Sequence, residues 1–139
     1  MDQELQDKLK NIFREHQLVS LATIRDGKPW VRYVMTTGDG LDLYVNTHRE
    51  SRKVKQIYKD PHVHVVLGFK GDMQNPEYVQ MAGVAQVLDD KVTKEKMWVD
   101  YLTNYFTSVD DPNYVVLKIT PELIEYYETG SMSPTVVTF

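Results

Sequence analysis

Hydrophobic residues near the N-terminus recur every three or four positions. Leu5, Leu9, Ile12 and Phe13 would lie on one side of a helix. This spacing predicts an amphipathic helix over about residues 2–16. We expect its apolar stripe to pack against the rest of the domain.

The pattern then changes to the two-residue alternation that is typical of strands. Turn residues interrupt it at Asp26-Gly27 and again at Gly38-Asp39-Gly40, and the first of these is a strong hairpin signal. The sequence therefore predicts three consecutive antiparallel strands, over residues 18–24, 30–37 and 41–46.

The rest of the chain mixes helical and strand patterns, and no element is predicted for residues 129–139. Short strands joined largely by tight turns favour a mainly β fold, a small antiparallel barrel of about six strands with peripheral α-helices. The further elements that we expect are a helix over 50–59, strands over 63–69 and 78–88, a helical segment between Asp90 and Asp110, and strands over 114–120 and 123–127.

Composition excludes several classes of protein. The chain of 139 residues suits a single domain, and it contains no cysteine, so it offers no thiolate nucleophile and no sulfur-bound metal. Its net charge of −4 argues against general nucleic-acid binding, which needs a broad basic surface. No apolar run approaches the length that crosses a bilayer, and we expect a cytoplasmic protein without membrane contact.

A basic segment stands where the third strand gives way to the next helix. Thr47 and Glu50 have the spacing of a capping box, which would begin the helix there. Cations are unfavourable at a helix N-terminus because of the exposed N–H groups and the helix dipole. Three of them nevertheless follow at once, namely Arg49, Arg52 and Lys53.

A bound anion would resolve this conflict. Backbone N–H groups of the first turn, the Ser51 hydroxyl and the cationic side chains could converge on a phosphate, and Arg32 on a neighbouring strand could join them. The alternative is a solvated face of an amphipathic helix, as most charged runs are. The spacing alone does not decide between the two.

Other candidate sites have simpler interpretations. His62 and His64 share a strand face but lack a further ligand at partner spacing, so we assign no metal. The paired acids Asp89-Asp90 and Asp110-Asp111 suit caps and turns. The sequence contains no nucleophile elbow, dinucleotide-binding glycine motif or P-loop. Aromatic residues at helical spacing are interpreted as packing, namely Trp98, Tyr101 and Tyr105.

A series of short segments in a fixed order along the chain carries a family resemblance. The segments are residues 21–23, 26–29, 31–34, 43–47, 51–54, 60–63, 79–85, 110–119 and 121–127. Their order and spacing are more specific than any one segment and cover nearly the whole chain. Together they resemble the pyridoxamine 5′-phosphate oxidase-like flavin-binding split-barrel superfamily, and within it the general stress protein 26-like branch.

The resemblance implies a six-stranded antiparallel split β-barrel with peripheral helices and a single FMN-binding domain over residues 1–139. It also implies a homodimer with the cofactor site at the subunit interface. By this resemblance the FMN phosphate is held by Arg32, Ser51, Arg52 and Lys53. The ring system would lie on Val34, Met35, Thr36 and Thr37, with Asn46 and Thr47 at its edge, and the second subunit would contribute Tyr78 and Gln80.

Two classes of function follow from this resemblance. One is an FMN-dependent oxidoreductase acting on a small molecule, although Thr37 replaces a lysine that is usual in the vitamin-forming oxidases, so pyridoxamine phosphate is not the expected substrate. The other is a non-catalytic protein that binds flavin, deazaflavin or haem during stress. A structural β domain with a basic surface is the third interpretation. The substrate, the electron donor and the electron acceptor are not indicated.

Overall fold

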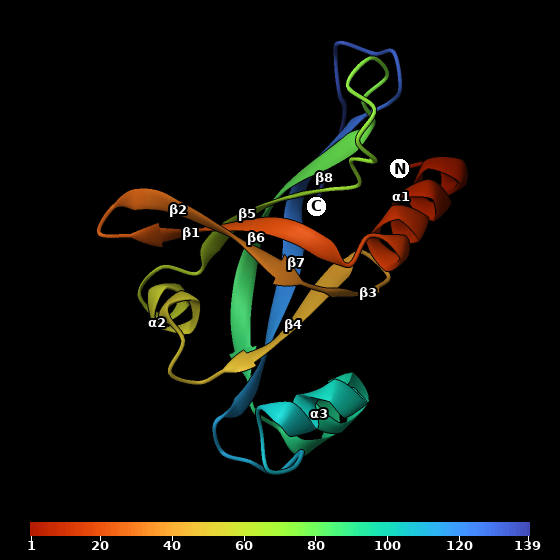
Figure 1. Ribbon diagram of the computed structural model, residues 1–139. Helices are drawn as coiled ribbons and strands as arrows, with labels where there is room; N and C mark the ends of the chain where they lie inside the picture. Colours follow the sequence, from red (N-terminus) through yellow and green to blue (C-terminus); the bar gives the residue numbers. More distant parts are fainter.

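The computed structural model describes residues 1–139 and consists of one antiparallel sheet of eight strands with three α-helices and a short 3-10 helix (Figure 1). No helix is both long and apolar enough to span a bilayer. In chain order the elements are α1 (Gln3–Glu15), β1 (Leu18–Arg25), β2 (Lys28–Met35), β3 (Thr37–Asp39), β4 (Asp42–His48), α2 (Arg52–Lys59), β5 (His62–Leu67), β6 (Tyr78–Leu88), α3 (Lys91–Met97), η1 (Asp100–Asn104), β7 (Tyr114–Tyr127) and β8 (Thr135–Thr138).

The sheet curls into a barrel that is left open along one seam. Its strand order is β2-β1-β5-β6-β7-β4-β3, and β8 pairs with the second half of β7. Strands β2 and β4 are not hydrogen-bonded to each other but are in contact. The predicted mainly β, antiparallel class is confirmed. The strand count is eight because β3 and β8 are short additional strands that the sequence pattern did not separate.

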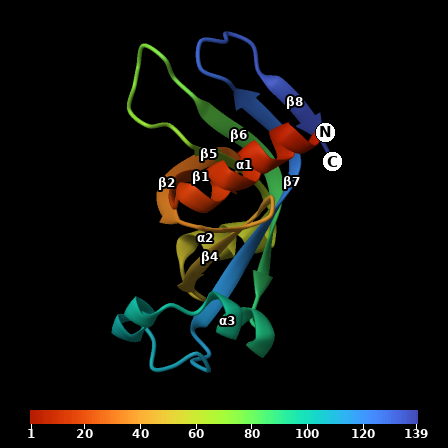
Figure 2. The ribbon, with the colours of Figure 1, turned by 90° about the vertical axis from the view of Figure 1, so that its right-hand side faces the viewer.

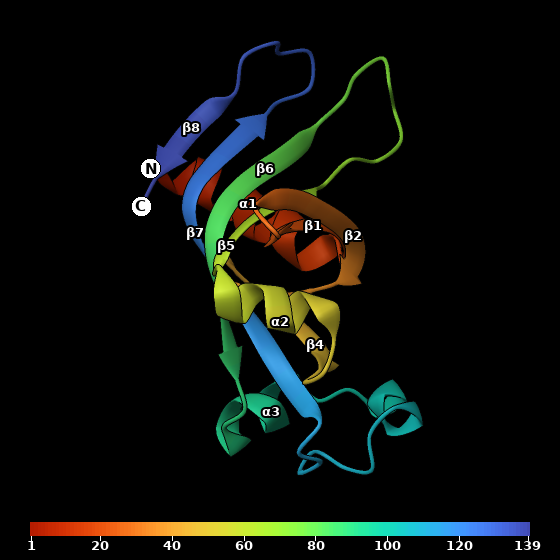
Figure 3. The ribbon, with the colours of Figure 1, turned by 90° about the vertical axis from the view of Figure 1, so that its left-hand side faces the viewer.

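Alternating side chains of the strands fill the interior of the barrel. Leu21, Val65, Met81 and Leu117 are fully buried there. The predicted stripe of α1 packs into the same core, and α1 lies across the curled sheet (Figure 2). On another side α2 packs against β1 and β6 through its buried apolar residues (Figure 3).

Two glycines fit places where a side chain would be strained or would clash. Asp26 and Gly27 both have positive φ, 51° and 77°, as a two-residue type I′ hairpin requires, which confirms the predicted turn between β1 and β2. A Cβ on Gly83 would lie 2.6 Å from the carbonyl oxygen of Thr120. The long strands β6 and β7 can therefore approach closely at the register shift between Ala82 and Gly83.

The helical segment after β6 is not continuous. Asp90 caps α3 by accepting from the backbone N–H of Thr93, but the helix ends at Met97 and Val99 is extended. Trp98 turns inward and meets the ring of Tyr114 edge-on. Together with Leu102 and Phe106 these rings form a second, smaller core, which the separate helix η1 completes.

Candidate functional site

Most of the predicted site residues lie along the seam between β2 and β4. Strand β2 is the terminal strand at one end of the sheet, so one of its edges has no strand partner. On β4, only residues 42–44 pair with β3, which leaves Val45–His48 unpaired on the side away from β7. Two backbone edges with free hydrogen-bonding groups therefore border the seam, and α2 begins close to it.

The start of α2 differs from the predicted capping box. Ser51 is the N-cap residue and the helix begins at Arg52, so the prediction that Thr47 and Glu50 form the cap is wrong. Glu50 stays outside the helix because its backbone N–H donates to Nδ1 of His48. Thr47 instead donates from its hydroxyl to the hydroxyl oxygen of Ser51 over 3.3 Å. The Ser51 side chain makes no capping bond to the first turn.

Arg32 points from β2 toward the inner side of the sheet, where neutral groups hold it. Its Nη1 donates to the carbonyl oxygen of Leu21 over 3.1 Å, and its Nη2 donates to Oε1 of Gln56 over 2.9 Å. The same Gln56 oxygen accepts a hydrogen bond from the hydroxyl of Thr23, and both Gln56 and Thr23 are buried. The guanidinium group is thus fixed by two acceptors, neither of which carries charge.

Lys53 lies near this guanidinium group. Burial lowers the pKa of the Lys53 ammonium group below its usual value, and the nearby positive charge of Arg32 lowers it further. Burial also lowers the pKa of Arg32. Neither residue forms an ion pair with an acidic side chain. Two neighbouring cations without a counter-ion raise each other's free energy, and an anion would relieve this.

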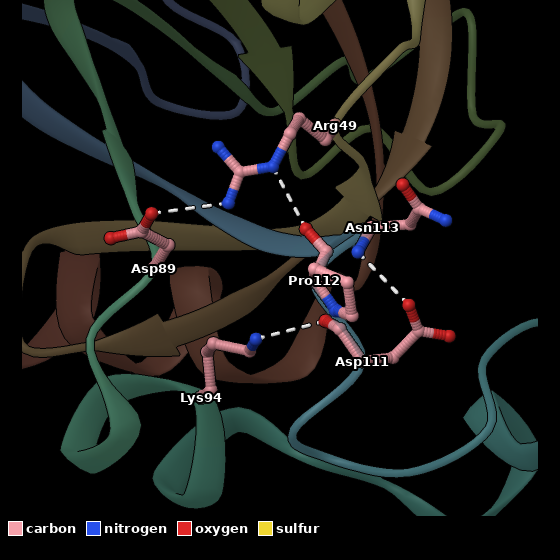
Figure 4. Close-up of polar contacts among 6 residues, drawn as sticks. All are labelled: Arg49, Asp89, Lys94, Asp111, Pro112 and Asn113. Atoms are coloured by element: carbon pink, nitrogen blue, oxygen red, sulfur yellow. Dashed lines mark hydrogen bonds and ion pairs between the residues drawn. The ribbon is translucent and has the colours of Figure 1, made fainter.

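The other two cations of the basic segment have different surroundings. Arg49 donates from Nε to the carbonyl oxygen of Pro112 over 2.8 Å, and its Nη2 lies 3.1 Å from Asp89 (Figure 4). It therefore ties the β4–α2 loop to the loop before β7. Arg52 is exposed and borders a separate hollow on the hairpin side of α2. Gln56, which accepts a hydrogen bond from Arg32, also lines this hollow.

A second part of the site is a small hollow of about 100 Å³ at the end of β2. Strands β2 and β4 form one wall of it, and the segment from α3 to η1 forms another. Three consecutive predicted ring contacts are among its lining residues, and so is Asn46. The full lining is Gln17, Met35, Thr36, Thr37, Tyr44, Asn46, Met97, Val99 and Tyr101.

Two of the predicted ring contacts are already engaged inside the chain. Asn46 donates from Nδ2 to the carbonyl oxygen of Met97 over 2.8 Å and accepts from the hydroxyl of Tyr114 over 2.9 Å. Burial raises the pKa of Tyr114 to about 12, so this hydroxyl remains a donor. Val34 is buried in the core. Because the Val34 side chain is buried, only its backbone groups are available to a ligand in the seam.

Tyr78 and Gln80 lie away from the seam. Both are on β6, and β1 and β5 separate that strand from β2. Tyr78 stacks on Tyr127 with ring centroids 4.7 Å apart, and Gln80 stands opposite Val66 and Glu125 in the sheet. Within one chain these two residues do not reach the other predicted site residues.

The weaker candidates are placed as follows. Asp111 accepts hydrogen bonds from the backbone N–H groups of Thr107 and Asn113, which confirms its interpretation as a turn residue. Asp90 caps α3, which confirms the interpretation of the other acidic pair. His62 Nδ1 lies 2.7 Å from a carboxylate oxygen of Asp60. The structure contains no group of three or more histidine and acidic side chains arranged to hold a metal ion.

The sequence pattern predicted packing for Tyr101 and Tyr105 and did not indicate that Tyr101 lies beside the hollow. Tyr101 lines the hollow and is about half exposed, whereas Tyr105 is exposed elsewhere. Val99 is extended, and after this break in the helix Tyr101 lies beside the hollow. No local pattern in the sequence marks this break, because Val92 and Thr93 are β-branched like Val99 and lie within α3.

Comparisons of the sequence and of the structure with known proteins indicate the same family. The profile of the pyridoxamine 5′-phosphate oxidase family matches residues 5–128. The chain is 36% identical over 132 residues to general stress protein 26 of Bacillus subtilis, which covers 95% of this chain and 94% of that protein. It superimposes on the crystal structure of general stress protein 26 from Bacillus anthracis with a TM-score of 0.84 and 32% identity, over 98% and 99% of the two chains.

A more distant structure shares the fold. A heme binding protein from Mycobacterium smegmatis superimposes with a TM-score of 0.78 at 16% identity, over 99% of this chain and 59% of that one. At this identity the likeness concerns the fold.

Proposed function

Since the chain belongs to the pyridoxamine 5′-phosphate oxidase family, we propose that it binds FMN in the seam between β2 and β4 and acts as an FMN-dependent oxidoreductase on a small molecule. The observation that carries this proposal is the pairing of Arg32 and Lys53 without an acidic partner. A phosphate monoester carries the negative charge that would balance these two cations.

The phosphate end of FMN fits the residues beside α2. Arg32 can offer a planar pair of N–H donors, and Lys53 a compact ammonium group. The hydroxyls of Thr47 and Ser51 lie at the same helix start, where backbone N–H groups favour anions. Arg52 can contribute only if its exposed side chain turns around the helix start toward Lys53.

The ring end of FMN fits the hollow and the free edge of β2. Met35 and Tyr101 provide apolar surface there, and the unpaired backbone of β2 and β4 provides hydrogen-bonding groups for a heterocycle. The hollow is too small to enclose a three-ring system, so part of the ring remains for a second subunit to cover. FMN, when bound, supplies hydride and electron transfer, which no side chain of this cysteine-free chain provides.

A homodimer is part of the proposal. Val31 and Tyr33 on β2 are 66% and 74% exposed, and the register places Leu18 and Met35 beside each other at the same end of the β1–β2 pair. Exposed apolar residues in one continuous patch favour association. A second copy packed on this outer face would add its Tyr78 and Gln80 to the site.

The experiment is an absorption spectrum of the purified protein, followed by titration with FMN. Flavin bands, or saturable binding of added FMN with quenching of its fluorescence, are the expected result. A protein that shows neither contradicts the proposal, and a Soret band would favour haem, the ligand that is named for the Mycobacterium smegmatis protein. Bleaching of bound flavin by a reduced nicotinamide, with reoxidation by an added acceptor, separates an enzyme from a passive binding protein.

A further inference from the structure

Gln56 contacts the candidate phosphate site without adding charge to it. It lies on the buried side of α2 with 9% of its surface exposed. Its Oε1 accepts hydrogen bonds from Arg32 and from Thr23. Since Leu21 holds the other end of the guanidinium group, the two acceptors fix both the plane and the direction of Arg32.

A carboxylate at this position would be the stronger acceptor for an arginine. Glutamate has nearly the shape of glutamine, so the space beside Arg32 and Thr23 could hold it. It would also cancel the positive charge of Arg32. Burying an arginine against neutral acceptors costs free energy, and this cost is recovered when an anion occupies the site.

Lys53 shows that the charge of Arg32 acts on its neighbours. The positive charge of Arg32 contributes to the low pKa of Lys53, after burial. An acidic residue at position 56 would remove this effect. The neutral contacts of Arg32 therefore keep two uncompensated charges side by side.

We propose that Gln56 is a positioning residue that orients Arg32 toward the cofactor phosphate while leaving the arginine charge uncompensated. The site thereby selects a dianionic phosphate monoester over the same ring system without a phosphate. This inference rests on the proposed binding of FMN and assigns the preference for its phosphate to a residue that does not touch the ring hollow.

The test compares Gln56→Glu with the wild type, using FMN and riboflavin as the two probes in calorimetric titrations. We expect FMN affinity to fall by roughly 10- to 100-fold, riboflavin affinity to stay within about twofold, and thermal stability to be maintained because the new carboxylate pairs with Arg32. Lys59→Gln is the matched control, since it also lowers the net charge by one, at the exposed end of the same helix. It should leave the preference for FMN unchanged.

The outcomes separate the two claims. A wild-type protein that binds FMN and riboflavin equally contradicts the proposed phosphate site. A wild type that prefers FMN, together with a Gln56→Glu variant that prefers it equally, contradicts only the role of Gln56. A parallel loss of affinity for both probes would mean that Gln56 only supports the fold, and it also overturns the inference.

A second readout needs no cofactor. The titration of Lys53, followed by NMR of its side chain, should move to higher pH in Gln56→Glu because the carboxylate compensates Arg32. The groups that face position 56 are Arg32 and, across the outer hollow, Arg25, Asp26, Arg52, Lys55 and Lys59. The Lys59→Gln control accounts for the general effect of the outer charges. An unchanged Lys53 titration would overturn the claim that Gln56 leaves the Arg32 charge uncompensated.

Discussion

The side-chain amide of Asn46 donates a hydrogen bond to the backbone carbonyl oxygen of Met97 over 2.8 Å. This bond fastens the end of α3 to β4. Asn46→Ala should lower the free energy of unfolding by about 1–3 kcal/mol, because it leaves buried polar groups unpaired. Urea unfolding without flavin measures this change, and hydrogen exchange should quicken between Met97 and Asn104.

The control for this prediction is Asn104→Ala. Asn104 is exposed on η1, and a surface substitution of this kind should change stability by less than about 0.5 kcal/mol. If the two variants unfold alike, Asn46 does not anchor α3.

Tyr101 should contribute to binding through the flavin ring. It lines the hollow beside Met35, and an aromatic contact of this kind is worth about 0.5–1.5 kcal/mol. Tyr101→Ala should therefore weaken FMN and riboflavin by the same factor, roughly two- to tenfold. Tyr105→Ala, which removes an exposed ring outside the hollow, is the matched comparison. A larger loss for FMN than for riboflavin would be incompatible with a ring contact.

The outer face of β2 should hold the dimer together. Tyr33→Asp places a charge in the centre of the exposed apolar patch, and burying an unpaired carboxylate is unfavourable. Light scattering coupled to gel filtration should give a dimer for the wild type and a monomer for this variant. Tyr58→Asp alters a similarly exposed tyrosine on α2 and should remain dimeric. A monomeric wild type contradicts the proposed interface.

The preference for FMN over riboflavin should decline at alkaline pH. The pKa of Lys53 is lowered in the free protein, whereas a bound phosphate favours the charged ammonium form. At a pH where the free lysine is partly deprotonated, FMN binding is therefore accompanied by uptake of a proton on Lys53. FMN affinity therefore weakens as pH rises through the Lys53 pKa, below the usual lysine value of about 10.4. Lys53→Arg should remove this decline, since arginine stays charged. Persistence of the same decline in that variant would assign it to another group.

Much of the fold follows from local patterns. Strand β6 has the predicted bounds, and the Asp26-Gly27 turn lies where its chemistry requires. The sequence pattern was less informative where distant contacts override it. The segment after Asp90 has helical spacing throughout, but α3 ends at Met97, and the ring of Trp98 packs edge-on against Tyr114, a residue on the distant strand β7.

The residue types of the candidate site could be predicted from the sequence, but the contact partners of each side chain could not. The pattern indicated a cluster of cations, yet Arg49 bonds to Asp89 and Pro112, which are 40 and 63 residues away in sequence. No local pattern reports such contacts. Gln56 was not predicted for the same reason, because a glutamine within a helix belongs to no motif until its partners on β1 and β2 are known.

The binding of a phosphate by Arg32 and Lys53 is the central claim, and one comparison tests it most directly. It is the ratio of the riboflavin and FMN dissociation constants, measured for the wild type, Lys53→Ala and Arg52→Ala. The account predicts a clear preference for FMN that falls roughly 10-fold or more in Lys53→Ala and changes much less in Arg52→Ala, whose side chain lies outside the pair. A ratio near one in the wild type, or a ratio unaffected by Lys53→Ala, would contradict it.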